Sequence, residues 1–310
     1  MSIPSVKLNT GAEIPAVGYG TWQLKPEDAV KQVEYAIKEA GYRHIDCAFG
    51  YLNETSVGEG IRNSGVPRSE LFITSKVWGT WHRKVEECLD MTLAALGTDY
   101  LDLYLMHWPI PLNPNGSHPL IPLRPDGKRD IDDAWDIKDT WKQLEALLKK
   151  GKVRAIGVSN FSQKTLEAFL PYVEITPAVD QLELHPYNPD HALVAYLESK
   201  GIVLQAYSPL GSTNSPLISD ETVAKIAEKY SFTPADVLLG WHVAKGRVVI
   251  ARSNTPSRIA SNIKGAAAAA QALSKEDLAT LDGIAAAGKQ QRLVTPPWGI
   301  DLGFEHWPSQ

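Results

Sequence analysis

Four residues that could transfer or steer protons lie at, or just beyond, the ends of short apolar runs. They are an acid, a phenol, an ammonium and an imidazole: Asp46, Tyr51, Lys76 and His107. The runs, 44–48, 71–77 and 101–107, have the composition of buried β-strands. In a repeating strand–helix architecture the carboxyl ends of such strands meet at one opening, where catalytic side chains usually lie. We therefore expect these four side chains to converge on one site.

The chemistry of such a site would be acid catalysis by the phenol. A free tyrosine has a pKa of about 10 and needs a lowering of about 3 units, roughly 4 kcal/mol, to be an efficient acid at neutral pH. An ammonium about 4 Å away supplies on the order of 4 kcal/mol at an effective dielectric constant of about 20. Lys76 suits this task, Asp46 would keep it charged, and His107 would hold the substrate oxygen. We expect Tyr51 to protonate a carbonyl oxygen as a hydride reaches the carbon.

Each residue alone has a simpler explanation, such as a barrel-closing ion pair or core packing, and only the set of four favours catalysis. Cys47 and Cys88 are interpreted as reduced thiols; Cys47 fills space in the barrel and is not a nucleophile. Glu183 and His185 alternate along a strand-like run but have no further ligands at metal-site spacing, so no metal site is predicted.

Strand-like and helix-like segments alternate along the chain. Eight segments are typical of strands buried on both faces: 16–22, 44–48, 71–77, 101–107, 153–159, 178–184, 202–208 and 248–252. Helical patterns cover 26–40, 55–63, 85–96, 137–150, 163–169, 191–200, 221–230, 234–244 and 256–264. Residues 6–14 resemble a β-hairpin with a Thr-Gly turn. We predict an α/β fold in which residues 1–310 form one domain, a single (β/α)8 TIM barrel with an N-terminal hairpin.

A doubly wound dinucleotide-binding fold is the competing architecture. It needs a G-x-G-x-x-G turn after its first strand, and Gly18-Tyr19-Gly20 supplies only two of the three glycines. The barrel is therefore favoured. Loops follow its fourth and seventh strands at 109–136 and 208–212, and a tail covers 290–310; such long irregular segments are usually lids or binding loops. We expect them to lie over the barrel mouth.

Composition narrows the range of partners. The 310 residues carry a formal net charge of −5, which disfavours nucleic acid and anionic membrane surfaces as partners. Residues 1–10 lack a signal-peptide pattern, and no apolar run approaches the length of a membrane span. We expect a cytoplasmic protein that acts on small molecules, and a monomer, because no spare apolar helix face stands out.

Further motifs extend the pattern around the four residues. They are G-Y-R-H-I-D at 41–46, Y-L-N-E at 51–54, I-T-S-K-V-W at 73–78, H-W-P at 107–109, G-V-S-N-F at 157–161 and Q-A-Y-S-P-L-G at 205–211. With these motifs nearly the whole chain resembles the aldo-keto reductases, in their aldose and aldehyde reductase branch. The resemblance implies a barrel with a catalytic tetrad of Asp46, Tyr51, Lys76 and His107, in which Tyr51 is the proton donor.

The resemblance also implies an NADP(H) site. Ser159, Asn160 and Gln181 would hold the nicotinamide carboxamide, and Tyr207 would stack on the ring. The other cofactor-binding residues that it implies are Gly20, Thr21, Trp22, Ser208, Leu210, Ser212, Arg252, Ser253, Asn254, Thr255, Arg258 and Asn262.

The adenosine-phosphate segment, 252–262, departs from the family pattern. Ala251-Arg252 stands where the family has Pro-Lys, and Ser261 replaces the acid that precedes the last asparagine. Arg252 still offers a cation, and its planar fork suits a 2′-phosphate. Arg258 would stack on the adenine or join that phosphate. We therefore expect NADP(H) to be preferred to NAD(H).

Indole rings are expected to wall the substrate pocket: Trp22, Trp78, Trp108 and Trp298. Such walls suit alkyl or aryl aldehydes, and indole N–H groups also bind sugar hydroxyls. The resemblance points to fungal NADP-dependent glycerol dehydrogenases and glyceraldehyde reductases, and so implies reversible reduction of glyceraldehyde, small aldoses and other aldehydes. Two alternatives are a cofactor-sensing regulatory protein of the same fold and a barrel glycosidase that uses Asp180 and Glu183.

Overall fold

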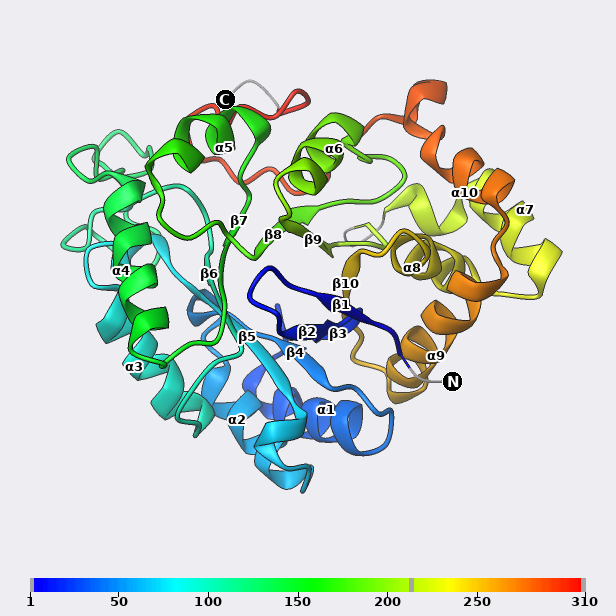
Figure 1. The fold of residues 1–310 in the computed structure, drawn as a ribbon, viewed down its shortest axis with the longest axis horizontal. Coiled ribbons are helices and arrows are strands. Elements are labelled where there is room, and N and C mark those ends of the chain that lie inside the picture. The colour runs from blue at the N-terminus through cyan, green and yellow to red at the C-terminus, as the bar shows by residue number, and fades with distance from the viewer. Residues whose placement is uncertain (1–2, 212–214, 308–310) are drawn as a thin grey trace.

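The structure of the chain is a computed structural model that describes residues 3–211 and 215–307. Within them, parallel strands close into a barrel in the order β10, β3, β4, β5, β6, β7, β8, β9 (Figure 1). Their bounds are Val17–Gly20 (β3), His44–Asp46 (β4), Phe72–Val77 (β5), Leu103–Met106 (β6), Ile156–Ser159 (β7), Val179–Glu183 (β8), Val203–Tyr207 (β9) and Val248–Ala251 (β10). The predicted (β/α)8 barrel is confirmed, and the closed sheet excludes the doubly wound alternative.

Helices surround the barrel. Their bounds are Pro26–Lys38 (α1), Glu54–Asn63 (α2), Val85–Leu96 (α3), Ile137–Lys149 (α4), Gln163–Phe169 (α5), His191–Ser199 (α6), Glu221–Tyr230 (α7), Pro234–Ala244 (α8), Pro256–Ala272 (α9) and Lys275–Asp282 (α10). Short helical turns are Phe49–Tyr51 (η1), Arg68–Glu70 (η2), Gly79–Trp81 (η3), Leu170–Tyr172 (η4), Pro216–Ser219 (η5) and Ala285–Lys289 (η6). The sequence prediction was wrong in ending α9 at residue 264 and in missing α10.

An alanine-rich run explains the error at α9. Residues 266–270 are all alanine, which favours a helix but shows no apolar periodicity. The small side chains allow α8 and α9 to pack closely, since a Cβ at Gly240 would lie 2.5 Å from the Cβ of Ala269. The run is therefore a packing surface, and the helix continues through it.

Strand alternation determines which residues point into the barrel. Residues two apart on a strand share a face. Phe72 of β5 and Leu105 of β6 pack in the inner cluster of the barrel, whereas Ile73 belongs to the larger cluster that includes the helices. Lys76 therefore shares the inward face with Phe72, and His107 shares it with Leu105. Because side chains alternate between the two faces of a strand, both Lys76 and His107 point into the barrel.

The amino-terminal hairpin closes one end of the barrel. β1 (Ser5–Lys7) pairs antiparallel with β2 (Glu13–Pro15), as predicted. Leu8 and Ile14 are buried with the inner cluster, and the Asn9 side-chain amide donates to the backbone carbonyl of Thr176 at 3.1 Å. Figure 1 looks onto this end, where the hairpin crosses the barrel. The carboxyl ends of the strands open on the opposite side.

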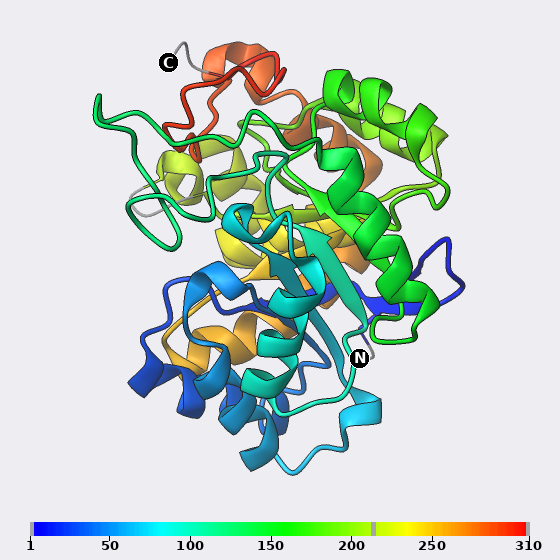
Figure 2. The ribbon, with the colours of Figure 1, turned by 90° about the vertical axis from the view of Figure 1, so that its left-hand side faces the viewer.

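Loop 109–136 and the tail from residue 290 lie at that open end, away from the hairpin (Figure 2). The Trp78 indole donates to the Leu120 carbonyl at 2.6 Å, and the Thr80 hydroxyl donates to the Pro119 carbonyl at 2.8 Å, which ties the loop to the end of β5. Both segments contribute side chains to the cavity at this end. The predicted position of loop and tail over the mouth is confirmed.

Among the described residues, every helix is too short or too polar to pass through a lipid bilayer.

Candidate active site

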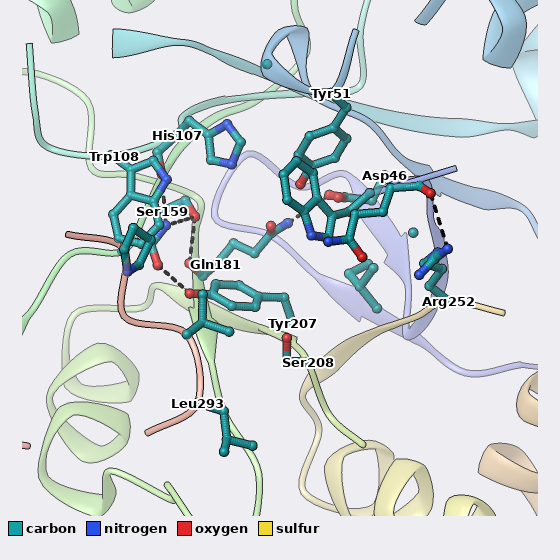
Figure 3. Close-up of a pocket in the computed structure, with 18 of the residues that line it drawn as sticks. Asp46, Tyr51, His107, Trp108, Ser159, Gln181, Tyr207, Ser208, Arg252 and Leu293 are labelled. Carbon is teal, nitrogen blue, oxygen red and sulfur yellow. Dashed lines mark hydrogen bonds between the residues drawn. The ribbon is translucent and has the colours of Figure 1, made fainter. Parts of the chain in front are cut away.

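A cavity of about 760 Å³ opens at the carboxyl ends of the barrel strands (Figure 3). Most of the residues that the sequence singled out line it: Gly20, Trp22, Asp46, Tyr51, Trp78, His107, Trp108, Ser159, Asn160, Gln181, Tyr207, Ser208, Leu210, Arg252 and Trp298. Lys76 is fully buried just behind this wall. The four side chains that were predicted to converge therefore lie together at the carboxyl ends of the strands.

The Lys76 ammonium is surrounded by three acceptors. Its Nζ lies 2.6 Å from Asp46 Oδ1, 2.7 Å from the Cys47 carbonyl and 3.4 Å from the Tyr51 hydroxyl. An ammonium has three N–H donors, so each acceptor can receive one. A buried charge is tolerated when it is paired and hydrogen-bonded in this way. The contact with Tyr51 is the longest of the three, and it is the one that faces the cavity.

Asp46 links the lysine to the opposite side of the barrel. Its Oδ2 accepts a hydrogen bond of 2.7 Å from the Gln181 side-chain amide on β8. Its backbone carbonyl accepts from both the backbone N–H and the hydroxyl of Thr21, each at 3.0 Å. Gln181, which we assigned to the cofactor, is thus also a hydrogen-bond partner of Asp46.

The turn after β4 positions Tyr51. Tyr51 ends η1, and its N–H donates to the Ala48 carbonyl at 3.0 Å. A Cβ at Gly50 would lie 2.7 Å from Trp78 Cε3, so glycine allows the indole to pack against the turn. The Asn53 amide then donates to the carbonyls of Thr21 and Leu24, at 2.8 and 3.0 Å, and fixes the turn to the end of β3.

The phenol of Tyr51 does not have the lowered pKa that we expected. Burial raises the pKa of Tyr51 well above its ordinary value, and the nearby Asp46 carboxylate raises it further. The cost of moving a phenolate out of water outweighs the attraction of the Lys76 ammonium. Tyr51 therefore keeps its proton in this structure, which is the state that a proton donor requires.

His107 is held as a neutral imidazole beside the phenol. Burial, together with the charge of Lys76, lowers the pKa of His107 well below its ordinary range. Its ring stands edge-on to Tyr51 and Trp78, with centroids 5.6 and 5.1 Å apart. A neutral imidazole has one N–H donor, which suits a hydrogen bond to a substrate carbonyl oxygen between His107 and Tyr51.

A row of polar side chains continues the wall from β7 to β9. The Tyr207 hydroxyl donates to Asn160 Oδ1 at 2.7 Å, and Asn160 Nδ2 donates to the Ser159 hydroxyl at 3.0 Å. Asn160 has a φ of +63°, a left-handed conformation that asparagine tolerates better than most residues. Amide and hydroxyl groups beside an aromatic ring form a surface that suits a nicotinamide carboxamide, so the residues present fit the implied cofactor.

Arg252 lies at the other side of the cavity from His107 and Trp108 (Figure 3). Its exposed guanidinium donates to the Gln23 carbonyl at 3.2 Å and to Asn254 Oδ1 at 3.0 Å. Other predicted cofactor residues do not line the cavity: Thr21, Ser253, Asn254, Thr255, Arg258 and Asn262. Ser212 lies outside the described residues. The contacts assigned to these residues remain predictions.

The sequence did not single out several residues of the wall. His118, Leu120, Ile121 and Arg129 come from loop 109–136, and residues 293–296 come from the tail. Both segments were predicted to lie at the mouth, but an irregular loop has no periodicity that tells which side chains face inward. The only sequence signal for these wall residues was that the loop contains arginine and histidine side chains.

Glu183 and Asp180 do not form a glycosidase pair. Glu183 Oε1 lies 2.9 Å from His185 Nε2, and both its oxygens accept from tail backbone N–H groups, of Leu293 at 2.6 Å and of Val294 at 2.9 Å. Asp180 is three residues away on β8, so it points to the opposite face of the strand. Within the described residues, no group of three potential metal ligands comes together.

Comparison with known proteins agrees with the fold and shows the family. The model of the aldo/keto reductase family matches residues 16–286. This chain belongs to the aldo/keto reductase family, as the motifs indicated, and it is an oxidoreductase of carbonyl and alcohol groups that uses a nicotinamide cofactor.

Similar proteins are found in fungi and animals. A D-galacturonate reductase of Hypocrea jecorina is 47% identical over 98% of this chain and 99% of its own length. A glycerol 2-dehydrogenase (NADP(+)) of Saccharomyces cerevisiae is 45% identical over 94% of both chains. The structure of aldose reductase from Schistosoma japonicum has a TM-score of 0.88 at 35% identity, over 99% of this chain and 98% of that one. None of these names supports the regulatory or glycosidase alternatives.

Proposed function

We propose that this protein is an NADPH-dependent reductase that converts aldehydes, including glyceraldehyde and small aldoses, to alcohols and catalyses the reverse oxidation. The observation that carries the proposal is the Lys76 ammonium placed between Asp46 and Tyr51, behind a cavity walled by indoles. The names of two relatives, a sugar-acid reductase and an NADP(+)-dependent glycerol dehydrogenase, support this substrate range.

The mechanism rests on three side chains. When bound, the cofactor supplies a hydride to the carbonyl carbon. The carbonyl oxygen accepts hydrogen bonds from His107 and Tyr51, and it takes the phenolic proton as the carbon–oxygen double bond becomes single. The Tyr51 phenolate that remains lies 3.4 Å from Lys76 Nζ, whose charge stabilises it until solvent returns a proton. Tyr51 need not lose its proton before the reaction, so its raised pKa is compatible with this role.

Arg252 supports the preference for NADP(H). It is an exposed guanidinium at the cofactor side of the cavity, bonded only to neutral oxygens among the described residues. A 2′-phosphate could form a charge-assisted, bidentate pair with it.

Replacing Arg252 with alanine tests this preference. Arg252→Ala should raise the Kd for NADPH by about tenfold or more, because a hydrogen-bonded ion pair is lost. The Kd for NADH should change less than about twofold. Fluorescence titration of both cofactors measures the two constants, and equal losses would contradict the assignment.

We further propose that the chain works as a single barrel domain, as a monomer in the cytoplasm, without nucleic-acid or membrane partners. The net charge of −5 supports the last point. The overall proposal is tested by following NADPH consumption with DL-glyceraldehyde, xylose, D-galacturonate and an aryl aldehyde. Turnover of at least one aldehyde with NADPH is expected, and failure with all four would refute the proposed function.

A further inference from the structure

The substrate side of the cavity contains an arginine without an acidic partner. Arg129, from loop 109–136, lines the cavity, and its guanidinium lies over the Trp298 ring at 5.6 Å from the centroid. Within residues 3–211 and 215–307 its guanidinium makes no hydrogen bond and no ion pair, and its Nε is buried. A half-buried guanidinium in that position is available to an anion.

Arg124, a second arginine of the same loop, differs from Arg129 because it has acidic partners. Arg124 donates to Asp130 at 3.4 Å and to Asp133 at 3.1 Å, and it does not line the cavity. Asp130, next to Arg129 in sequence, is thus engaged with Arg124 and with Asn113. Asp130 and Asp133 therefore pair with Arg124, Asp132 pairs with Arg83, and Arg129 is left for the cavity.

Arg129 lies apart from the reacting atoms but is connected to them by a wall of rings. From Tyr51 the wall passes through His107 and Trp78 to Trp298, with centroid distances of 5.6, 5.1 and 6.2 Å. Trp298 is almost fully buried, and its indole N–H has no hydrogen-bond partner among the described residues. An anion near Arg129 would therefore belong to the end of the substrate that is remote from its carbonyl.

We propose that Arg129 is a specificity-determining residue that selects aldehydes carrying a carboxylate at the end opposite the carbonyl, such as open-chain uronates. This inference rests on the proposed function and names the substrate class for the same site. The planar guanidinium matches a carboxylate through two parallel hydrogen bonds, and stacking on Trp298 holds its plane.

A carboxylate fits this environment better than a phosphate. Phosphate sites usually combine several cations or backbone N–H groups, because the dianion needs more than one donor group. His118, also on the wall, accepts with Nδ1 from the backbone N–H groups of Leu120 and Ile121, at 3.0 Å each, so this nitrogen carries no proton. Arg129 is then the one guanidinium among the described residues of the substrate-side wall, which suits a monoanion.

The test compares D-galacturonate with D-galactose, which differ only in a carboxylate in place of a CH2OH group. In Arg129→Met, an apolar side chain of similar length, kcat/KM for galacturonate should fall at least about tenfold, mainly through KM. The values for galactose and glyceraldehyde should change less than about twofold. The small open-chain fraction of each sugar cancels in the ratio of variant to wild type.

Two controls separate the outcomes. Arg124→Met, on the same loop but paired with acids, should leave the preference for galacturonate intact. Equal losses for galactose and galacturonate in Arg129→Met would overturn the inference, as would a larger loss for glyceraldehyde 3-phosphate than for galacturonate. In either case, turnover of glyceraldehyde with NADPH by the wild type would leave the proposed function standing. If the wild type reduced none of the aldehydes, both the proposed function and the role of Arg129 would be refuted.

Discussion

Asp46 and Glu183 are both buried carboxylates at the carboxyl ends of barrel strands, yet they bind different kinds of partner. Asp46 accepts hydrogen bonds from two side chains, Lys76 at 2.6 Å and Gln181 at 2.7 Å. Glu183 accepts from the backbone of the tail, at Leu293 and Val294. In the proposed mechanism the first carboxylate controls charge beside the reacting atoms, whereas the second fixes a segment of the cavity wall. The partners of such a carboxylate, more than its position, decide its role.

The charge state of Glu183 fits an anchoring role. Burial alone would raise the pKa of Glu183, but the hydrogen bond from His185 and those from the tail bring it below its ordinary value. The Arg292 guanidinium lies 3.8 Å from Glu183 Oε2 and 4.2 Å from the centroid of the Phe304 ring. The tail is thus held by one ionised side chain of β8 at its start and by ring contacts further on.

The largest effect in this comparison is expected at Asp46. In Asp46→Asn the buried Lys76 loses its counter-charge and the new amide faces that of Gln181, so the ammonium is destabilised by about 3–5 kcal/mol. This destabilisation would remove the support that Lys76 gives to the Tyr51 phenolate. We expect kcat for aldehyde reduction to fall by on the order of a hundredfold or more. Stopped-flow measurement of hydride transfer checks this, and a kcat near that of the wild type would remove Asp46 from the mechanism.

Glu183→Gln should produce a smaller effect of a different kind. The amide keeps one oxygen acceptor and turns an N–H2 group toward a backbone donor, at a cost of about 1–3 kcal/mol. The tail should loosen, so we expect KM for aldehydes to rise by about tenfold while the rate of hydride transfer at saturation stays within about threefold. Steady-state and single-turnover kinetics separate the two. A loss confined to the chemical step would make Glu183 part of the catalytic machinery and erase the distinction from Asp46.

The smallest change is expected from pH. His107 has a pKa held well below its usual value and Tyr51 one held well above, so between about pH 6 and 8 neither group changes its protonation. The lowered pKa of Glu183 keeps the tail anchor ionised over the same range. We expect kcat/KM for reduction to vary less than about twofold there. An acidic decline centred at about pH 6.5 would show that His107 titrates as an ordinary histidine.

The parts of the molecule that follow the strand–helix repeat were predictable from the sequence. Asp46, Lys76 and His107 lie on strands or at their ends, where a period of two and a shared barrel mouth determine direction. The direction of the Tyr51 pKa was not predictable, because it depends on how completely water is removed in three dimensions.

The positions of the irregular segments were predictable from the sequence, but the contacts of their individual side chains were not. Arg129 lies in a loop without periodicity, and its availability depends on Arg124 pairing with the acids nearby. The bond between Glu183 and the tail joins residues more than a hundred positions apart, which no local pattern indicates. The end of α9 was missed because alanines carry no hydrophobic period.

In the proposed mechanism Tyr51 gives its proton to the substrate and Lys76 stabilises the phenolate that remains. The most direct measurement is single-turnover hydride transfer from NADPH to DL-glyceraldehyde in wild type and in Tyr51→Phe, which removes only the hydroxyl. We expect the rate constant to fall by about a hundredfold to ten-thousandfold while the Kd for NADPH changes less than about twofold. Hydride transfer in Tyr51→Phe at close to the wild-type rate would contradict the mechanism.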